Sequence, residues 1–84
     1  MNAETLNILA AIKPESFKDR AFGCILGAFI GDSCGSFLEF EVNPISEEQI
    51  NECMKMNGGG PFSLGPGQVT DDSELAFCLM WGLI

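Results

Sequence analysis

Residues 17–39 read FKDRAFGCILGAFIGDSCGSFLE, and this stretch decides the fold class. Beyond Arg20 its side chains are almost wholly apolar or small, and glycines recur at positions 23, 27, 31 and 35. Because a helix turns about 100° per residue, glycines four apart drift slowly around one face and open a groove for close backbone approach. Each glycine costs about 0.5–1 kcal/mol relative to alanine, so packing must offset this cost. We therefore predict a helix from Phe17 to about Glu39, buried on nearly all sides in an all-α protein.

A membrane-spanning helix is the alternative interpretation of the glycine spacing. The uncharged run 21–31 has only 11 residues and is bounded by Arg20 and Asp32. A bilayer requires about 20 apolar residues, so we expect no segment of this chain to approach a membrane span. No secretory signal is visible, because no basic residue precedes the short apolar stretch 6–12. The sequence thus predicts a cytoplasmic protein without a membrane partner.

The charge balance limits the chemistry that the chain can perform. The 84 residues include 12 acidic and 4 basic side chains, for a formal net charge of −8, and no histidine. This charge repels polyphosphate, so we expect no nucleic-acid partner, whereas divalent cations are favoured. Without histidine, the usual general base of serine and cysteine hydrolases and the commonest zinc ligand are missing. Any catalysis must therefore use carboxylates, hydroxyls, backbone groups or a bound metal.

The chain carries more apolar surface than its length can easily bury. Hydrophobic residues make up 46% of it, and a chain of this size buries only about 60% of its unfolded surface. The apolar run 76–84 has no polar stop or basic last turn, so we expect a truncated chain or an oligomer. The cysteines, at positions 24, 34, 53 and 78, match no C-x-x-C spacing, and we predict that they are reduced core residues.

Two helix starts are signalled locally. Pro14 interrupts a short helix that we expect within residues 1–13, and Ser16 with Asp19 then fits the N-cap and first-turn acid of the long helix. Ser46 and Gln49 fit a capping box for a short surface helix.

The segment 58–67, GGGPFSLGPG, holds five glycines and two prolines, which predicts a loop. It lacks the G-K-[ST] of a Walker loop and the glycine spacing of a dinucleotide-binding turn. A connector that needs positive φ angles is one interpretation, and a ligand-binding loop is the other.

Five polar residues, Thr70-Asp71-Asp72-Ser73-Glu74, follow this loop and precede an apolar helical run. One interpretation is a helix N-terminus capped by Asp71, with Glu74 at the third helical position completing a capping box. The other is a metal site, because adjacent carboxylates and hydroxyls are hard ligands for Mg²⁺, Mn²⁺ or Ca²⁺, and a cation would remove their repulsion. The residue types leave both interpretations open.

A second pair of acids, Asp32 and Glu39, lies within the predicted long helix. Seven residues make nearly two turns, so both carboxylates would share one face, about 10 Å apart along the axis. Acids in apolar surroundings must be paired, bound to metal or protonated. Alternatively, Asp32 caps a broken helix and Glu39 marks an exit to the surface. Between Leu38 and Phe40, a buried Glu39 would suit proton transfer.

The order of these motifs resembles the N-terminal part of the ADP-ribosylglycohydrolase family, including its dinitrogenase reductase-activating branch. The resemblance runs from about residue 19 to 84 and covers roughly the first quarter of the family domain. It rests on the following segments: Asp19-Arg20-Ala21-Phe22-Gly23, Gly27-Ala28-Phe29-Ile30-Gly31-Asp32, Glu39-Phe40, Gly58-Gly59-Gly60 and Pro66-Gly67-Gln68-Val69-Thr70-Asp71-Asp72-Ser73.

The resemblance implies an orthogonal bundle of helices with a binuclear Mg²⁺ or Mn²⁺ centre in a cleft for ADP-ribose. The implied reaction is hydrolysis of the C1″ glycosidic bond between ADP-ribose and a modified side chain. The partner would be an ADP-ribosylated protein or a small ADP-ribose conjugate. Residues 1–15 would form an N-terminal extension, and 16–84 the N-terminal part of the domain.

The resemblance also assigns roles to individual residues. Asp32 matches a helix-breaking site that supports the active site, and Glu39 matches a residue that takes part in proton transfer. The remaining assignments are metal coordination by Thr70, Asp71 and Asp72, and a substrate loop formed by Gly58, Gly59 and Gly60.

The chain departs from the family pattern by ending early. A second ligand set, D-x-D-[ST], and the adenine-binding residues have no counterpart in it. Two metals need about a dozen oxygen ligands, which three adjacent residues cannot supply. We therefore expect the chain alone to be inactive and to need the missing C-terminal part of the domain. The alternative is a non-catalytic truncated paralogue, or a regulatory module completed by another chain.

Overall fold

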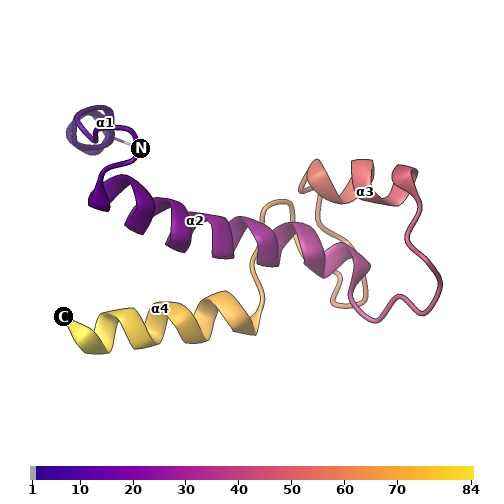
Figure 1. Ribbon diagram of the computed structural model, residues 1–84. Coiled ribbons are helices and arrows are strands. Elements are labelled where there is room, and N and C mark those ends of the chain that lie inside the picture. Colours follow the sequence, from indigo (N-terminus) through magenta and orange to yellow (C-terminus); the bar gives the residue numbers. More distant parts are fainter. Residues whose placement is uncertain (1) are drawn as a thin grey trace.

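The computed structural model describes residues 2–84 and confirms the all-α prediction (Figure 1). Its elements, in chain order, are α1 (Ala3–Ala10), α2 (Phe17–Gly35), the 3-10 turn η1 (Ser36–Leu38), α3 (Glu47–Met54) and α4 (Asp71–Leu83). The described residues form no strand beyond one isolated bridge between Gly59 and Leu64.

The helix starts follow the local sequence signals. Ser16 caps α2, because its hydroxyl accepts a hydrogen bond from the Asp19 amide at 3.2 Å, as predicted. The capping box of α3 is also confirmed: the Gln49 amide donates to the Ser46 hydroxyl at 3.2 Å, and the Ser46 amide donates to the Gln49 side chain at 2.9 Å. Asn2 caps α1, because its side-chain oxygen accepts a hydrogen bond from the Thr5 amide at 2.8 Å. This helix ends before Pro14, as expected.

The long helix α2 differs from the prediction at its C-terminal end. It runs unbroken through Asp32, whose carbonyl accepts a hydrogen bond from the Ser36 amide, so Asp32 neither breaks nor caps this helix. The chain then tightens into η1, and Glu39 leaves it with an extended ψ of 134°. We predicted that Asp32 and Glu39 lie on one face of a continuous α-helix. Because α2 ends at Gly35, this prediction is wrong.

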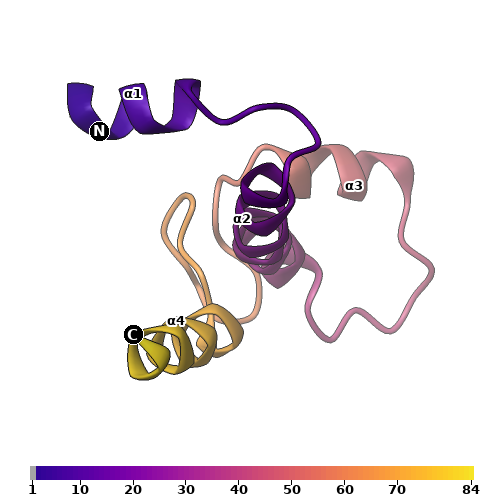
Figure 2. The ribbon, with the colours of Figure 1, turned by 60° about the vertical axis from the view of Figure 1, so that its left-hand side comes forward.

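Helix α2 is the centre of the arrangement. Figures 1 and 2 show that α4 runs beside α2 in roughly the opposite direction, whereas α1 lies across the start of α2. Helices α3 and α4 both pack on α2, and α3 also packs on η1. Within residues 2–84, α1 packs against no other helix.

The described residues enclose very little apolar surface. Only Cys34 and Cys53 are buried among the hydrophobic residues, and the polar residues Ser33, Ser36 and Ser73 are buried with them. The accessible surface of 6685 Å² exceeds the roughly 4,900 Å² expected for a folded monomer of this mass. The radius of gyration is 15.2 Å, compared with about 12 Å for a compact chain of this length.

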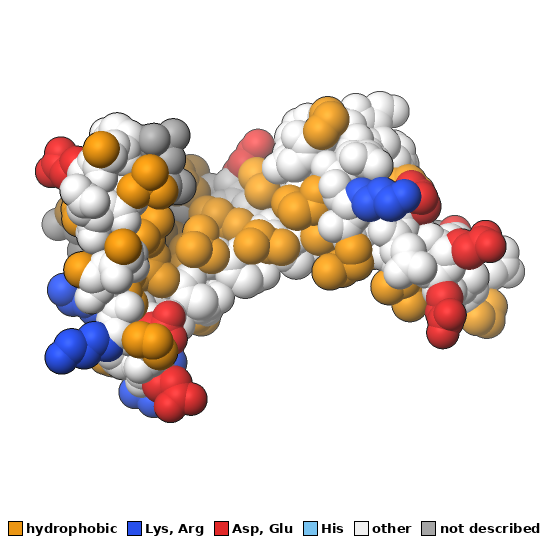
Figure 3. Space-filling model, turned by 90° about the horizontal axis from the view of Figure 1, so that it is seen from above, with side chains coloured by type: hydrophobic (Ala, Val, Ile, Leu, Met, Phe, Trp, Pro, Cys, Tyr) orange, Lys and Arg blue, Asp and Glu red, His pale blue; other side chains and the backbone are white. Residues whose placement is uncertain are grey.

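The predicted enclosure of α2 is therefore not provided by residues 2–84. A Cβ atom built on any of Gly23, Gly27, Gly31 and Gly35 would find nothing within 4 Å outside the helix itself. Figure 3 shows apolar side chains gathered along the middle of the molecule, where α2 runs.

The predicted cysteine state is confirmed, but not every predicted location. All four cysteines are free thiols, as predicted. Cys34 and Cys53 are buried, whereas Cys24 and Cys78 are exposed, because nothing among residues 2–84 covers the outer sides of α2 and α4.

The expectation that no segment approaches a membrane span needs correction. Phe17–Leu38 is 22 residues long with a mean hydropathy of 1.5, which is long and apolar enough to cross a bilayer by length and composition alone. A core helix of a soluble protein passes the same test. Arg20 in the first turn and the hydrogen-bonded Asp32 carboxylate favour the core helix over the span.

Candidate functional site

The glycine-rich loop is held in shape by its own backbone. Gly59 and Leu64 exchange two hydrogen bonds, with N···O distances of 2.8 and 3.2 Å, and the Gly67 amide closes the loop onto the Met56 carbonyl at 2.9 Å. Gly58, Gly59 and Gly60 have φ angles of 80°, 85° and 71°, so the expected positive φ angles are confirmed, while the role of these glycines as a connector or a substrate loop stays a prediction.

This loop packs tightly against the end of the long helix. A Cβ atom on Gly60 would lie 2.6 Å from the Ser36 carbonyl oxygen and 2.9 Å from the Phe37 Cα, so only glycine fits there. The Phe40 and Phe62 rings meet edge to face, with centroids 5.8 Å apart. These contacts bring segment 36–40, which carries Glu39, against the loop that leads into α4.

Among residues 2–84, the most concentrated polar contact joins α2 to the start of α4. Asp32 Oδ2 accepts hydrogen bonds from the Thr70 amide at 2.8 Å, the Ser73 hydroxyl at 2.6 Å and the Ser73 amide at 3.3 Å. Asp32 Oδ1 accepts from the Thr70 hydroxyl. One carboxylate of α2 therefore fixes two residues that lie 38 and 41 positions later in the sequence.

These hydrogen bonds also decide the charge state of Asp32. Partial burial of the carboxylate acts to raise its pKa. Four hydrogen bonds act in the opposite direction and together hold the pKa of Asp32 below its ordinary value of 3.8. They come from the hydroxyls and the backbone amides of Ser73 and Thr70. Asp32 is therefore ionised at neutral pH and acts purely as an acceptor.

The predicted cap of α4 is wrong by one residue. Thr70, not Asp71, is the N-cap, and no side chain of the segment itself caps the helix. The Thr70 hydroxyl donates to Asp32 instead, and the third helical position is Ser73 rather than Glu74, so the predicted capping box does not form. Asp32 accepts the Ser73 amide and thereby performs the capping function from another helix.

Ser73 is the participant that the sequence analysis missed. It is 4% exposed, and its hydroxyl makes the shortest hydrogen bond to Asp32 Oδ2. The available signal was the spacing of Thr70 and Ser73, because hydroxyls three residues apart lie on the same side of a helix start.

The acids of the first turn of α4 remain exposed. Asp71, Asp72 and Glu74 face solvent, and within residues 2–84 no three His, Cys, Asp or Glu side chains converge as a metal cluster would require. The oxygen donors are nevertheless of the type that Mg²⁺ and Mn²⁺ bind. Thr70 gives its proton to Asp32, so its oxygen keeps lone pairs for another partner.

A small cavity lies beside these donors. It has a volume of about 330 Å³ and is lined by Phe62, Leu64, Gln68, Val69, Thr70, Asp71 and Glu74. The apolar loop residues and the oxygen donors of the helix start thus share one hollow.

Glu39 is not part of this cluster. Its side chain is exposed, and no hydrogen bond joins it to Thr70, Asp71 or Asp72 within the described chain. Of the two settings left open for Glu39, the exit to the surface is therefore the one that the structure shows, because the chain leaves η1 at this residue. Its catalytic role stays a prediction, as do the metal roles of Thr70, Asp71 and Asp72.

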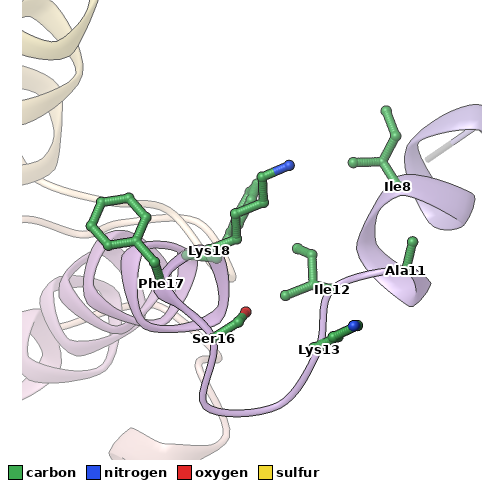
Figure 4. Close-up of a pocket in the computed structure, with 8 residues that line it drawn as sticks. Ile8, Ala11, Ile12, Lys13, Ser16, Phe17 and Lys18 are labelled. Carbon is green, nitrogen blue, oxygen red and sulfur yellow. The ribbon is translucent and has the colours of Figure 1, made fainter.

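A more voluminous cavity lies elsewhere. It occupies about 870 Å³ between α1 and the start of α2, and Ile8, Ile12 and Phe17 contribute to its apolar lining (Figure 4). Phe22 lines it as well. Lys13 and Lys18 are the charged residues in its lining, and no carboxylate lines it. This groove offers no ligands for a cation and is separate from the Asp32 contact.

Comparisons with known proteins point to one family. The family model described as ADP-ribosylglycohydrolase matches residues 13–84. The chain is 47% identical over 68 residues to an ADP-ribosylarginine hydrolase of Pseudomonas putida, a match that covers 81% of this chain and 17% of that protein. It is 44% identical over 77 residues to an ADP-ribosylarginine hydrolase of Serratia proteamaculans, covering 90% of this chain and 20% of the relative.

A third relative carries a different substrate in its name. The ADP-ribosyl-[dinitrogen reductase] glycohydrolase of Rhodospirillum rubrum is 42% identical over 64 residues, covering 76% of this chain and 22% of the relative. The chain thus spans about one fifth of the length of the curated relatives it matches. No solved structure matches it.

Proposed function

The chain belongs to the ADP-ribosylglycohydrolase family, and from this premise we propose that it forms the N-terminal, cation-binding part of a hydrolase that removes ADP-ribose from modified protein side chains. The names of the relatives support this substrate class, since they refer to ADP-ribosylarginine and to ADP-ribosylated dinitrogen reductase. The bond to be cleaved is the C1″ glycosidic bond of ADP-ribose. An ADP-ribosylated protein is the proposed partner, and a small ADP-ribose conjugate is the alternative substrate.

The observation that carries the proposal is the Asp32 contact. It fixes the start of α4 so that Thr70 is held by its amide and its hydroxyl, while Asp71 lines the 330 Å³ cavity and the next residue, Asp72, is exposed. In the proposal these three residues hold Mg²⁺ or Mn²⁺. Such an ion supplies charge stabilisation at the ribose and lowers the pKa of a bound water. Asp32 is the positioning residue, because it orients the Thr70 oxygen without touching substrate.

Glu39 is the proposed proton-transfer residue. Glycosidic hydrolysis needs a carboxyl group that protonates the leaving atom or deprotonates water. The Gly60 contact with η1 and the Phe40–Phe62 pair hold the segment of Glu39 against the loop that lines the cavity. This placement supports the role, and closer approach of the carboxyl group requires the substrate or further parts of the protein.

The donors of this chain are too few for a complete metal centre. Mg²⁺ takes six oxygen ligands, and no three acidic side chains converge within residues 2–84. We therefore propose that the chain by itself is inactive and that other residues complete the coordination. The same observation favours the second candidate function, a non-catalytic module that another chain completes.

The metal assignment is tested by titrating the purified chain with MgCl₂ and MnCl₂ in a calorimeter. We expect weak binding that the double variant Asp71→Asn/Asp72→Asn abolishes. The matched control is Glu47→Gln/Glu48→Gln, which removes two adjacent exposed acids from the first turn of α3. If both double variants lost metal affinity equally, the binding would be explained by general attraction to the net negative charge. This outcome would refute the metal assignment.

The catalytic assignment is tested in a chimera of the Pseudomonas putida relative in which this chain replaces the matching segment. We expect the chimera to release ADP-ribose from an ADP-ribosylarginine substrate. Glu39→Gln should lower the rate by about 10²–10⁴-fold, the range of general acid–base catalysis. The control Glu41→Gln removes a neighbouring exposed acid and should leave the rate unchanged. Full activity in Glu39→Gln would end the proposed role.

A further inference from the structure

Ser73 is the buried partner of the Asp32 carboxylate. It is 4% exposed, and both of its donors reach the same oxygen: its hydroxyl lies 2.6 Å and its amide 3.3 Å from Asp32 Oδ2. The Thr70 amide also donates to this oxygen, at 2.8 Å. Because a carboxylate oxygen carries about two lone pairs, these three donors leave Oδ2 no capacity for a further partner.

The other oxygen of this carboxylate is held by a single hydrogen bond. Asp32 Oδ1 accepts from the Thr70 hydroxyl. The terminal torsion of an aspartate side chain has a broad energy profile, so a carboxylate that is held weakly turns easily about it. The donors on Oδ2 remove this freedom and leave Oδ1 directed at the Thr70 hydroxyl. The direction of that hydroxyl therefore depends on how firmly Oδ2 is held.

The Ser73 hydroxyl differs from the other two donors to Oδ2. It belongs to a side chain, whereas the others are backbone amides of the start of α4. It is also the nearest of the three donors, and short hydroxyl bonds to a charged oxygen are among the strong hydrogen bonds of proteins. A change of this one side chain therefore loosens the carboxylate while both amide bonds stay available.

From this geometry we infer that Ser73 is a second positioning residue of the proposed metal site. Its hydroxyl locks the Asp32 carboxylate, so that the Thr70 hydroxyl keeps donating to Oδ1 and the lone pairs of the Thr70 oxygen stay free for an ion. The inference rests on the proposed function, because Thr70 is a metal ligand only there. Ser73 acts through Asp32. Without its hydroxyl the carboxylate turns, the Thr70 oxygen leaves the ion, and a water replaces it.

The surroundings of Ser73 allow a matched pair of variants. Ser73 lines a cavity of about 420 Å³ together with Phe29, Val69 and Phe77, so a further methyl group finds room there. Ser73→Thr keeps the hydroxyl, whereas Ser73→Val carries a methyl group in its place. Threonine and valine are both β-branched and have similar helix propensities. The difference between these two variants therefore isolates the hydroxyl.

The test uses the whole purified chain with Mn²⁺ and with Eu³⁺ as a luminescent probe. Electron paramagnetic resonance gives the Mn²⁺ affinity, and Eu³⁺ emission lifetimes in H₂O and D₂O count the waters on the bound ion. Ser73→Val should bind Mn²⁺ about 10-fold more weakly than Ser73→Thr, as expected when a metal ligand loses its hydrogen-bond support. Its Eu³⁺ should also carry an additional water. Thr70→Val should show the same additional water, and the double variant Thr70→Val/Ser73→Val should show no further gain.

Three outcomes would overturn the role of Ser73 alone, with wild-type binding intact. They are equal water counts in Ser73→Thr and Ser73→Val, a lower count in Ser73→Val, which would show that the released Asp32 binds the ion itself, and a further gain of water in the double variant. If Ser73→Val does not fold, Ser73→Ala provides the same comparison with a smaller side chain.

Failure of the proposed metal site would look different. The wild-type chain would then bind neither ion, or would bind both equally well in Asp71→Asn/Asp72→Asn. Either result would overturn the metal site and the positioning role together, whereas a loss of stability alone would leave the water count of the bound ion unchanged.

Discussion

Replacing Asp32 by asparagine is the sharpest test of the contact between α2 and α4. The side chain keeps its shape but loses its charge and one of its two acceptor atoms. In the native chain Oδ2 accepts three hydrogen bonds and Oδ1 accepts one. With the amide oxygen at the Oδ2 position, the new NH₂ group faces the Thr70 hydroxyl, which must turn and accept.

The size of the effect follows from these four bonds. A hydrogen bond to a charged group contributes about 1.5–3 kcal/mol, compared with about 0.5–1.5 kcal/mol for a neutral one. Because the four bonds share one carboxylate, their contributions are not additive. We expect Asp32→Asn to lower the free energy of unfolding by about 1–2 kcal/mol and Asp32→Ala, which removes every acceptor, by about 3–5 kcal/mol.

The assay is urea unfolding followed by circular dichroism, combined with amide hydrogen exchange. Exchange at the Thr70 and Ser73 amides should accelerate in Asp32→Asn, because both donate to the lost carboxylate. Asp19→Asn is the matched control: it removes the same charge, but Asp19 accepts only the exposed Glu15 amide. If exchange at Thr70 and Ser73 did not change, or changed equally in both variants, the reasoning would be refuted.

The same variant has a defined pH dependence. Because the pKa of Asp32 is lowered in the folded chain, its stabilising contribution is fully present above the ordinary value of 3.8. It is lost as the pH falls through the lowered pKa, where the folded carboxylate takes up a proton. The difference in unfolding free energy between wild type and Asp32→Asn should therefore be constant near neutral pH and shrink only in acid.

Three further predictions concern stability and use urea unfolding as the measurement. Gly60→Ala should lower the free energy of unfolding by about 2–3 kcal/mol more than Gly67→Ala does. Both glycines have a φ of 71°, but only a Cβ on Gly60 would lie against the Ser36 carbonyl oxygen. Equal losses in the two variants would contradict this close approach. Ser46→Ala should cost about 1 kcal/mol through loss of the α3 cap, and no loss would mean that the capping box is not stabilising. Gly27→Ala should stabilise the isolated chain by about 0.5–1 kcal/mol, because no atom lies within 4 Å of its Cβ position; destabilisation would show an unseen contact.

Local features of this fold could be predicted from the sequence, because their determinants lie within one helical turn. The caps at Ser16 and Ser46 depend on residues three positions away and formed as expected. The cap of α4 was placed one residue too late because its acceptor, Asp32, lies 41 positions before Ser73. Helical periodicity and capping patterns involve residues a few positions apart, so they do not predict a contact between residues 41 positions apart.

The residues of the candidate site also differ in how well their positions could be predicted from the sequence. The position of Thr70, Asp71 and Asp72 at a helix start could be predicted, since a glycine-rich loop is followed by acids and an apolar run. The sequence leaves the exposure of Glu39 open, because the setting of this residue depends on the change from α-helix to 3-10 geometry at Ser36. Helical periodicity fails wherever the helix type changes.

The glycine ladder shows where the stability of this chain must come from. Four glycines in a helix interior cost roughly 2–4 kcal/mol relative to alanine, which is a large part of the net stability of a small domain. Within residues 2–84 no neighbouring atom approaches any of the four, so their only effect in the chain alone is unfavourable. A helix packed closely against the ladder would reverse the sign, because glycine then permits close backbone approach that an added methyl group would obstruct. A stabilising Gly27→Ala would therefore show that residues 2–84 contain no contact that offsets the cost of the ladder.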